Sequence, residues 1–582
     1  MSRREKTLRT LFGFALALAT FLTRFPIRAK TFFEFDSINF AVGTFRFDLG
    51  QVTPQMPGYI LHVLFGRLLY WLTDDLNLAY VWVSILLSIG AVLFLWRAAA
   101  VLRGERVGVI AALLWLTLPI FWFHGAVASI YAEEAFYTSL LLYLGLKIIT
   151  NYELRITNEN VLHRIVILYS IAFSLAGAAR PTSLLFFFPA TVFLFWKRRV
   201  PKRSLTTGIG CFFLVTALWF GELIRESGGL AAYLHYANVE NNFKTQSILF
   251  GNSWYSQVDL IGKVLFYFVI GLGPTWILVM MVNVVFARRS VAFVRKYSRN
   301  AAARFVALVA LMPMAFYLIV FFMKAGYLLN VMPSAILVGA VVLDQAGIWL
   351  AERQKGRTKG KNLLTQTFIT RNLIWLTGSV VLFNVLWFFV PWPGTQQKFY
   401  DNEDTRNSFV HGAVNRYEHS QSRVLTLANR AFEYTNVSGI RAVDSLNDRV
   451  IQALQANGAS DSGEVILASW WYRWSYLLFP HAVTYDLELD PYHPGALWVG
   501  RANELHRDFL DHPGDSVIRF HSTHPMLLLL RHDRPDFEEV ARQVHLERLP
   551  LPEYLDIYKI LDSSFVLKLH GRTFVGTCGA RP

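Results

Sequence analysis

The stretch from Phe33 to Tyr59 reads FEFDSINFAVGTFRFDLGQVTPQMPGY. It follows an apolar segment whose leading end, MSRREK, is basic. Because a basic flank marks the cytoplasmic side of a membrane, we expect the stretch to emerge on the opposite, outer face. It carries Asp36 and Asp48 among aromatic residues. A carboxylate held at a membrane surface in such a setting is a candidate general base, and the alternative is an amphipathic surface segment with two solvated acids.

The composition is that of a polytopic membrane protein. Of the 582 residues, 54% are hydrophobic and only 17% are charged, whereas soluble chains average about a quarter charged. The net charge of +15 comes from short basic clusters between apolar segments, as the positive-inside rule predicts, and this distribution argues against nucleic acid as a partner. The two cysteines, Cys211 in an apolar segment and Cys578 in the tail, do not indicate a disulfide framework. The first apolar segment lacks a small-residue cleavage site, so we expect a retained anchor.

The apolar segments predict about eleven membrane spans. A spanning helix needs about 20 residues, so the shorter segment Ile60–Leu72 is assigned to the outer interface. This assignment puts Arg97, Arg103, Arg106 and every later basic loop on the cytoplasmic side. We therefore expect a multi-pass protein of the plasma (inner) membrane with a cytoplasmic N-terminus. The predicted spans are Leu8–Leu22, Leu78–Trp96, Val107–Phe123, Phe136–Ile149, His163–Ala179, Leu184–Trp196, Leu205–Gly221, Val258–Phe286, Phe305–Phe322, Leu328–Leu350 and Leu373–Val390.

The composition changes after Pro391, where long apolar segments give way to a mixture of polar, charged and short apolar runs. The predicted fold class is therefore mostly α, a polytopic membrane module over residues 1–391, followed by a soluble, extracytoplasmic α/β domain over residues 392–582. Helices are predicted at Leu425–Tyr434 and Asp444–Gln455. The predicted strands are Val465–Ala468, Ala482–Tyr485, Val517–Phe520 and Met526–Leu530.

Two basic residues stand at outer ends of predicted spans. Lys324 follows a strongly apolar run in FFMKAGYLLNVMP, and Arg180 precedes Pro181. A charge in the membrane costs roughly 2.5–3.5 kcal/mol on insertion scales, so such residues tend to be functional. Either residue could hold a lipid phosphate, and the alternative for both is snorkelling to the interface.

The pattern FDSINFAVGTFRFDLGQVTPQMPGYILHVLFGRLL resembles the first outer loop of bacterial integral-membrane glycosyltransferases of the C-type (GT-C) fold, the superfamily of protein O-mannosyltransferases and aminoarabinose transferases. The resemblance extends over about residues 1–390 in order and spacing. Gln55 and Met56 depart from it, because they stand where the family has His-Pro. Ser129 stands where the family often has Glu, with Glu133 and Glu134 a few residues further on. The matching residues are Asp36-Ser37, Asn39-Phe40-Ala41, Phe47-Asp48 and Pro57-Gly58-Tyr59.

The resemblance implies an inverting glycosyltransferase that uses a polyprenyl-phosphate-linked sugar on the outer face. Transfer to a hydroxyl needs a base for the acceptor proton, and the resemblance assigns that role to Asp36. A second carboxylate could hold the acceptor or a metal ion. For Glu133 and Glu134 the alternative is that acids in a first helical turn complement the helix dipole. Lys324, Arg180 and Gln55 are the candidates for the donor phosphate, Glu133, Glu134 and Asp48 for the acceptor or a metal, and Tyr59 and Tyr327 for further binding.

The sugar, the acceptor (protein, lipid or polysaccharide) and any metal are not specified by these patterns. No cofactor is assigned, and a divalent cation is left open. The expected partners are the lipid-linked sugar, the acceptor and membrane lipid. The alternative class is a transporter or lipid flippase, for which we would expect charged or broken mid-span segments and an internal repeat. A third class is a scaffold anchored by the spans, although anchoring needs far fewer of them.

Overall fold

The computed structural model divides into two compact units, each described by itself. The first comprises Met1–Lys30, Pro57–Trp392 and Ser422–Ile440, and the second Thr31–Met56, Pro393–Gln421 and Arg441–Pro582. The residues described are 3–49, 52–153, 159–197, 200–239, 247–298, 300–322, 324–355, 362–390, 434–459, 465–468, 482–486, 497–500, 510–511, 517–529, 535–549, 557–569 and 572–579.

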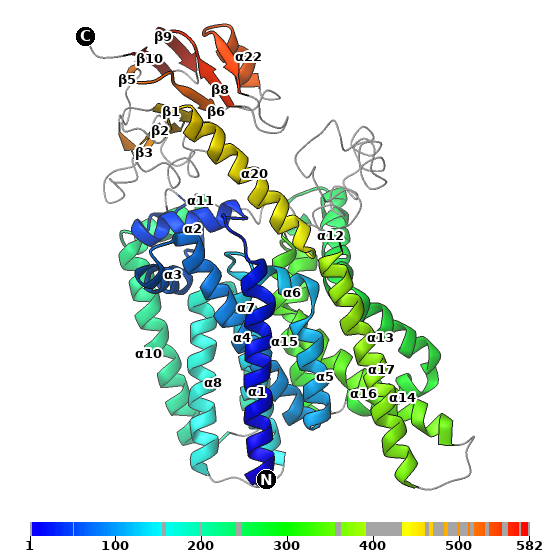
Figure 1. Cartoon of the computed structure of the whole chain (residues 1–582). Coiled ribbons are helices and arrows are strands. Elements are labelled where there is room, and N and C mark those ends of the chain that lie inside the picture. The colour runs from blue at the N-terminus through cyan, green and yellow to red at the C-terminus, as the bar shows by residue number, and fades with distance from the viewer. Residues whose placement is uncertain are drawn as a thin grey trace. The chain divides into compact units, whose positions relative to one another are not determined.

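The first unit is helical, and its long helices run side by side (Figure 1). The helix α20 (Val437–Ala456) begins in this unit and ends in the second. The other helices of the unit are α1 (Arg3–Arg24), α3 (Ile60–Thr73), α4 (Leu76–Arg103), α5 (Glu105–Leu116), α6 (Pro119–His124), α7 (Tyr131–Glu153), α8 (Glu159–Ala179), α9 (Thr182–Lys197), α10 (Lys202–Glu226), α11 (Leu230–Val239), α12 (Trp254–Leu272), α13 (Pro274–Val285), α14 (Ala287–Tyr297), α15 (Ala301–Ile319), α16 (Met332–Lys355) and α17 (Asn362–Phe389), with short 3-10 turns η1 (Phe25–Ile27), η4 (Ile248–Phe250) and η5 (Ala325–Asn330).

Within the described residues, 8 helices are long and apolar enough to cross a membrane, or up to 9 if α13 and α14 form one bent span. The chain is thus a multi-pass membrane protein, but the predicted count of eleven is not confirmed. The expected interfacial segment is α3, a shorter apolar helix of 14 residues. The eight segments are Arg3–Ile27, Leu76–Arg103, Glu159–Ala179, Lys202–Glu226, Trp254–Leu272, Ala301–Ile319, Met332–Arg353 and Thr367–Phe389.

The expected single span Val258–Phe286 is wrong, because the chain breaks there into α12 and α13. Gly273 lies between them with a φ of 50°, in the left-handed region that favours glycine. Pro274 follows and begins α13, a position at which the missing N–H of proline costs no helical hydrogen bond. The two residues end one helix and begin another inside an otherwise continuous apolar run.

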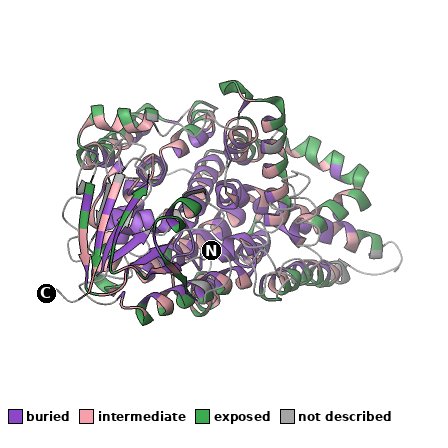
Figure 2. Cartoon of the chain, turned by 90° about the horizontal axis from the view of Figure 1, so that it is seen from above, coloured by how far each residue is buried: buried purple, intermediate pink, exposed green. Residues whose placement is uncertain are grey.

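The helix α4 is central to the first unit and packs against α1, α3, α5 and α7. Close approach depends on small residues: a Cβ at Gly90 would overlap the ring of Phe136 on α7. Outer helix faces carry exposed apolar side chains, such as Phe14 on α1 and Phe213 on α10. Figure 2 shows buried residues along inner helix faces and exposed residues along outer ones. This distribution is expected for helices that face lipid.

A set of arginines gathers at one end of these helices. Arg9 pairs with Glu105 at 2.7 Å, and Arg106 pairs with Asp344 on α16. The side chain of Arg103 donates to Gln345 at 3.1 Å. Asn330 stands just before the opposite end of α16, about 20 Å from Asp344 at the rise of a helix. The two ends of the first unit therefore carry different polar groups.

The second unit contains the helix α2 (Phe35–Phe45), the helix α22 (Pro535–Ala541) and two sheets. In the described residues, one sheet has 7 strands in the order β4-β3-β2-β1-β6-β8-β7, and the other has 3 in the order β5-β10-β9. The strand β1 pairs in parallel with β2 and β6, and the remaining pairs of the larger sheet are antiparallel. The strands are β1 (Val465–Ala468), β2 (Val483–Asp486), β3 (Leu497–Gly500), β4 (Leu510–Asp511), β5 (Val517–Ser522), β6 (Leu527–Leu529), β7 (Leu546–Arg548), β8 (Ile557–Ile560), β9 (Ser564–Leu569) and β10 (Arg572–Cys578).

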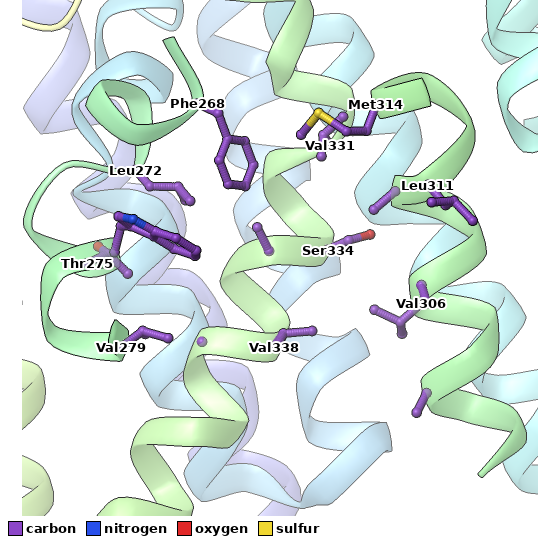
Figure 3. Close-up of a pocket in the computed structure, with 16 residues that line it drawn as sticks. Phe268, Leu272, Thr275, Val279, Val306, Leu311, Met314, Val331, Ser334 and Val338 are labelled. Atoms are coloured by element: carbon purple, nitrogen blue, oxygen red, sulfur yellow. The ribbon is translucent and has the colours of Figure 1, made fainter. Parts of the chain in front are cut away.

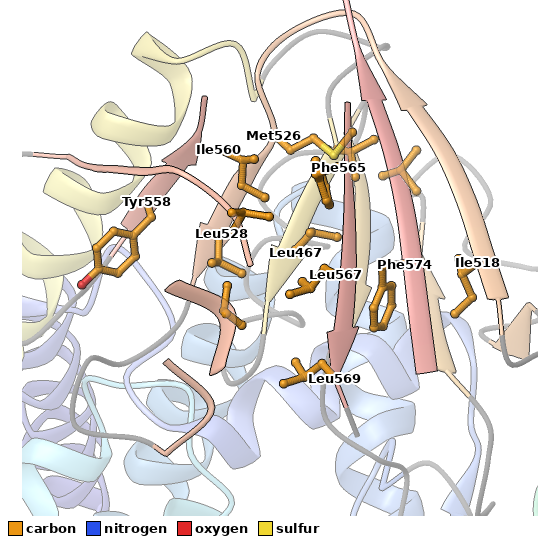
Figure 4. Packing of buried hydrophobic residues seen from close by; sticks show 14 residues of the cluster. Leu467, Ile518, Met526, Leu528, Tyr558, Ile560, Phe565, Leu567, Leu569 and Phe574 are labelled. Carbon is orange, nitrogen blue, oxygen red and sulfur yellow. The ribbon is translucent and has the colours of Figure 1, made fainter. Parts of the chain in front are cut away.

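An apolar cluster forms a core of the sheets (Figure 4). Leu467 and Leu528 come from the larger sheet, and Ile518, Leu567 and Phe574 come from the smaller one. The alternation along β9, where every second residue is buried, is that of a half-buried strand. The expected α/β fold of the C-terminal region is thus confirmed, with β1 at its predicted bounds and the other three predicted strands within two residues. The predicted helix at 444–455 lies inside α20, whereas 425–433 are outside the described residues.

The beginning of the Phe33–Tyr59 stretch is joined to α20 within the second unit. The backbone N–H and the hydroxyl of Thr31 donate to Asp444 at 3.0 and 3.1 Å. Asn447 donates to the Thr31 hydroxyl at 2.8 Å and to the Phe32 carbonyl at 3.4 Å. These residues are more than 400 positions apart in the chain. Side chains of α20 thus satisfy the backbone that leads into α2.

Candidate active site

Two adjacent carboxylates lie in the first turn of α7. Glu133 and Glu134 occupy the position expected of acids that complement a helix dipole. Both are nevertheless buried, with 0% and 3% of their surface exposed. A buried acid has to be paired or hydrogen-bonded, because its desolvation is costly. The helix-dipole explanation alone therefore does not account for them.

Glu134 is the centre of a buried network built from four elements. One of its carboxylate oxygens accepts a hydrogen bond from Arg180 Nη1 at 2.6 Å, and the other accepts from Asn330 Nδ2 at 3.1 Å. Asn330 Nδ2 also lies 2.6 Å from the hydroxyl of Tyr317 on α15. Arg180 directly follows α8, and Asn330 ends η5. The network thus joins the ends of helices that are far apart in sequence.

Arg180 is enclosed by aromatic rings as well as by Glu134. Its guanidinium carbon lies 4.2 Å from the centroid of the Tyr327 ring, which stacks on Tyr317 at 5.8 Å. Tyr59 lies within electrostatic range of the same guanidinium. The side chain is only 6% exposed, so the snorkelling alternative does not describe it. Among the residues that the structure describes, Arg180 Nε has no hydrogen-bond partner, which leaves a donor for an anionic oxygen.

Glu133 makes a separate pair with a residue that the sequence analysis did not assign. Its Oε2 lies 3.1 Å from Nδ1 of His62 on α3, and both side chains are 0% exposed. The His62 ring also lies 5.0 Å from the ring of Tyr80. The available signal was a lone histidine in a short, mostly apolar helix. Glu133 Oε1 has no hydrogen-bond partner among the described residues.

A second histidine, His124 at the end of α6, lies beside Lys324. Its Nδ1 shares a 3.1 Å hydrogen bond with the hydroxyl of Ser129, and its ring lies 4.9 Å from that of Tyr131. Burial, and secondarily the charge of Lys324, lowers the pKa of His124 from 6.5 to about 3. The imidazole is therefore neutral at physiological pH. Ser129, which stands where the resembled family often has Glu, instead orients this ring.

Three of the predicted site residues belong to the second unit. Asp36 is half-buried in the first turn of α2. Asp48 pairs with Arg46 at 3.3 Å, and its backbone bridges to Thr53 in a tight turn. Gln55 is half-buried, and its Oε1 has no hydrogen-bond partner within the described part of the chain. Glu133, Glu134, Arg180, Lys324, Tyr59 and Tyr327 all belong to the first unit.

The described residues contain no group of three or more His, Cys, Asp or Glu side chains that could hold a metal ion. The carboxylates that were candidates for such a site have other partners: His62 for Glu133, Arg180 and Asn330 for Glu134, and Arg46 for Asp48.

An apolar cavity of about 440 Å³ lies between α12, α13, α15 and α16. Figure 3 shows Phe268 and Leu272 of α12, Met314 of α15 and Val331 pointing into it. Val331 directly follows Asn330, so the cavity begins next to the polar network. Its lining is almost entirely hydrocarbon, which suits an acyl or isoprenoid chain rather than a sugar.

The arrangement of helices is shared with known membrane enzymes. The structure of ArnT from Cupriavidus metallidurans in the apo state matches with a TM-score of 0.54 and 11% identity, covering 95% of this chain and 98% of that one. The structure of the same protein bound to undecaprenyl phosphate matches with a TM-score of 0.53 and 10% identity, covering 96% and 98%. The chain is therefore a multi-pass membrane protein with the GT-C glycosyltransferase fold, as the first-loop pattern led us to expect.

A sequence family also matches part of the chain. Residues 49–204 match the model of the family described as protein O-mannosyl-transferase TMEM260 N-terminal domain. The matched segment contains Tyr59, His62, Glu133, Glu134 and Arg180, whereas Asn330 and Tyr317 of the buried network lie beyond it. No curated protein matches the chain.

Proposed function

We propose that the chain is an inverting glycosyltransferase that moves a monosaccharide from a polyprenyl-phosphate donor to an acceptor hydroxyl on the outer face of the membrane. The observation that carries the proposal is Arg180, a buried cation held between Glu134 and Tyr327 with Nε unpartnered among the described residues. The fold and the O-mannosyl-transferase family match support the same class.

The proposed reaction needs one carboxylate base and cations for the leaving phosphate. The acceptor oxygen attacks the anomeric carbon while the bond from that carbon to the phosphate oxygen breaks. Asp36 takes the acceptor proton, and the lipid phosphate leaves with the bonding electrons. A single displacement inverts the anomeric centre. In this proposal Arg180 and Lys324 stabilise the departing phosphate, and the apolar cavity accepts the polyprenyl chain.

The buried partners make Glu134 a positioning residue for Arg180 rather than an acceptor ligand. Both of its carboxylate oxygens already accept hydrogen bonds, one from Arg180 and the other from Asn330. Glu133 keeps one unpartnered oxygen among the described residues and remains the candidate for an acceptor hydroxyl. The arginine-rich end of the helices, about 20 Å away, supports an extracytoplasmic location for the site under the positive-inside rule.

The test is transfer of radiolabelled sugar from a panel of polyprenyl-phosphate monosaccharides in membranes that contain the full chain. We expect transfer by the wild type and its loss in Asp36→Asn and Arg180→Gln. Arg371→Gln is the matched control, because Arg371 is exposed on α17. Full activity of Asp36→Asn would show that the base is assigned incorrectly.

The break at Gly273 and Pro274 is a feature also expected of the alternative class, a transporter or lipid flippase. The same membranes distinguish the two classes. Movement of the labelled lipid across the liposome bilayer, without sugar transfer from any donor, would favour the transporter.

A further inference from the structure

The helix α14 turns sharply away from the apolar helix that precedes it. Its sequence is ARRSVAFVRKY, and the bend between α13 and α14 is 103°. Because α13 is apolar enough to lie in the membrane, a helix at about a right angle to it runs along the membrane surface. Short basic helices with an apolar side are typical of that location.

One face of α14 is fixed against the rest of the first unit. Ser290 is buried, and the ring of Phe293 lies 6.2 Å from that of Trp349 on α16. The guanidinium of Arg103 stacks over Phe293 at 5.4 Å and over Tyr297 at 5.0 Å. These contacts determine which side chains of the helix face outward.

An apolar strip on the outward side continues from α13. Val291 and Val294 are 61% and 60% exposed, and Val284 and Val285 at the end of α13 are 72% and 63% exposed. The strip is therefore an extension of a surface that already suits lipid. A soluble acidic partner would not account for this continuity.

Four further exposed positions of α14 are cationic. Arg289 pairs with Glu352 at 3.0 Å. Arg288, Arg295 and Lys296 are exposed, and none of them pairs with a carboxylate of the described residues. Three unneutralised cations beside an apolar strip match the phosphates of an anionic bilayer surface.

We propose that α14 is a membrane-surface helix that binds anionic phospholipid headgroups. Val291 and Val294 enter the boundary of the acyl region, and Arg288, Arg295 and Lys296 bind the lipid phosphates. This role is independent of the reaction proposed above, because it concerns the arginine-rich end of the helices.

The first test measures lipid binding by the purified full chain. Dioleoyl phosphatidylglycerol and dioleoyl phosphatidylcholine are titrated separately, and bound lipids are counted by native mass spectrometry. The variant Arg288→Gln/Arg295→Gln/Lys296→Gln should bind phosphatidylglycerol roughly fivefold more weakly per charge removed, with phosphatidylcholine unaffected. Arg519→Gln/Arg542→Gln/Lys568→Gln removes the same charge from exposed residues of the second unit and should bind like the wild type. Equal losses in both variants, or no loss in the first, would overturn the proposal.

The second test locates the helix without relying on charge loss. A spin label is attached at Val294→Cys in a Cys211→Ser/Cys578→Ser background and studied in vesicles containing phosphatidylglycerol. We expect collisions with oxygen to exceed those with a water-soluble nickel chelate. A label equally open to the chelate in vesicles and in detergent solution would place α14 in water and contradict the proposal.

Discussion

The two ends of the helical unit hold their charges in opposite ways. At the arginine-rich end, the pair Arg9–Glu105 leaves 35% and 37% of its side chains exposed. At the other end, the pair Arg180–Glu134 leaves 6% and 1%. Exposed pairs contribute little to stability, whereas breaking a buried pair is expensive. The two ends therefore differ in how far their charged pairs are shielded from solvent, and so in how much the loss of one partner should cost.

Arg180→Met should give the largest change in the free energy of unfolding and so tests this comparison most directly. It leaves Glu134 as a buried carboxylate without its cation, and we expect a loss of about 3–5 kcal/mol in the free energy of unfolding. Thermal unfolding in detergent measures it. The double variant Glu134→Gln/Arg180→Met should recover much of the stability but no transfer activity. A single variant as stable as the wild type would refute the idea that the pair is structurally required.

Asn330→Ala should have the next largest effect. It removes hydrogen bonds to Glu134 and Tyr317, of which the one to the charged group contributes about 1.5–3 kcal/mol. The matched control is Asn283→Ala, because Asn283 donates only to the Val279 carbonyl of its own helix. We expect the control to unfold within about 1 kcal/mol of the wild type. Equal losses in the two variants would contradict a special role for the network.

The pH dependence of stability tests the electrostatic side of the comparison. Burial lowers the pKa of His124 to about 3, below its value in the unfolded chain. The unfolded state therefore binds the proton first, and stability is lost as the pH falls below about 6.5. Between pH 7 and pH 5 this residue should account for about 2 kcal/mol. The difference between wild type and His124→Gln isolates it, and parallel pH profiles would show that His124 does not titrate in this way.

The smallest effect is expected at the arginine-rich end. Arg9→Gln removes an exposed pair and should change the free energy of unfolding by less than about 1 kcal/mol. Thermal unfolding at low and high salt measures it, and the small difference should shrink further at high salt. A loss as large as that of Arg180→Met would erase the contrast between the two ends.

Much of the fold could be predicted from sequence, because apolar length and strand alternation are local signals. The C-terminal α/β fold and the short apolar helix α3 were predicted on this basis. The span count was less accessible, since apolar run length alone cannot show where Gly273 and Pro274 divide a helix. Burial of Glu133 and Glu134 was also hidden, because acids in a first helical turn are normally solvated.

The partners within the site could not be predicted at all. Glu134, Arg180 and Asn330 come from three segments, and only tertiary packing brings them together. His62 was visible as a histidine in a short, mostly apolar helix, but its pairing with Glu133 on α7 depends on tertiary packing. The first-loop pattern pointed to Asp36 and Asp48, whereas the buried network lies on later segments of the chain.

The position of Asn330 depends partly on the missing side chain of Gly326. Gly326, four residues earlier, lies so close to the ring of Tyr131 that a Cβ atom there would overlap it. Tyr131 begins α7 and is itself buried, so the ring has little space to withdraw. In a library that randomised position 326, even alanine would push η5 away from α7. It would lengthen the hydrogen bond from Asn330 to Glu134. The network therefore accepts only the hydrogen of glycine at position 326, and functional clones should retain glycine there.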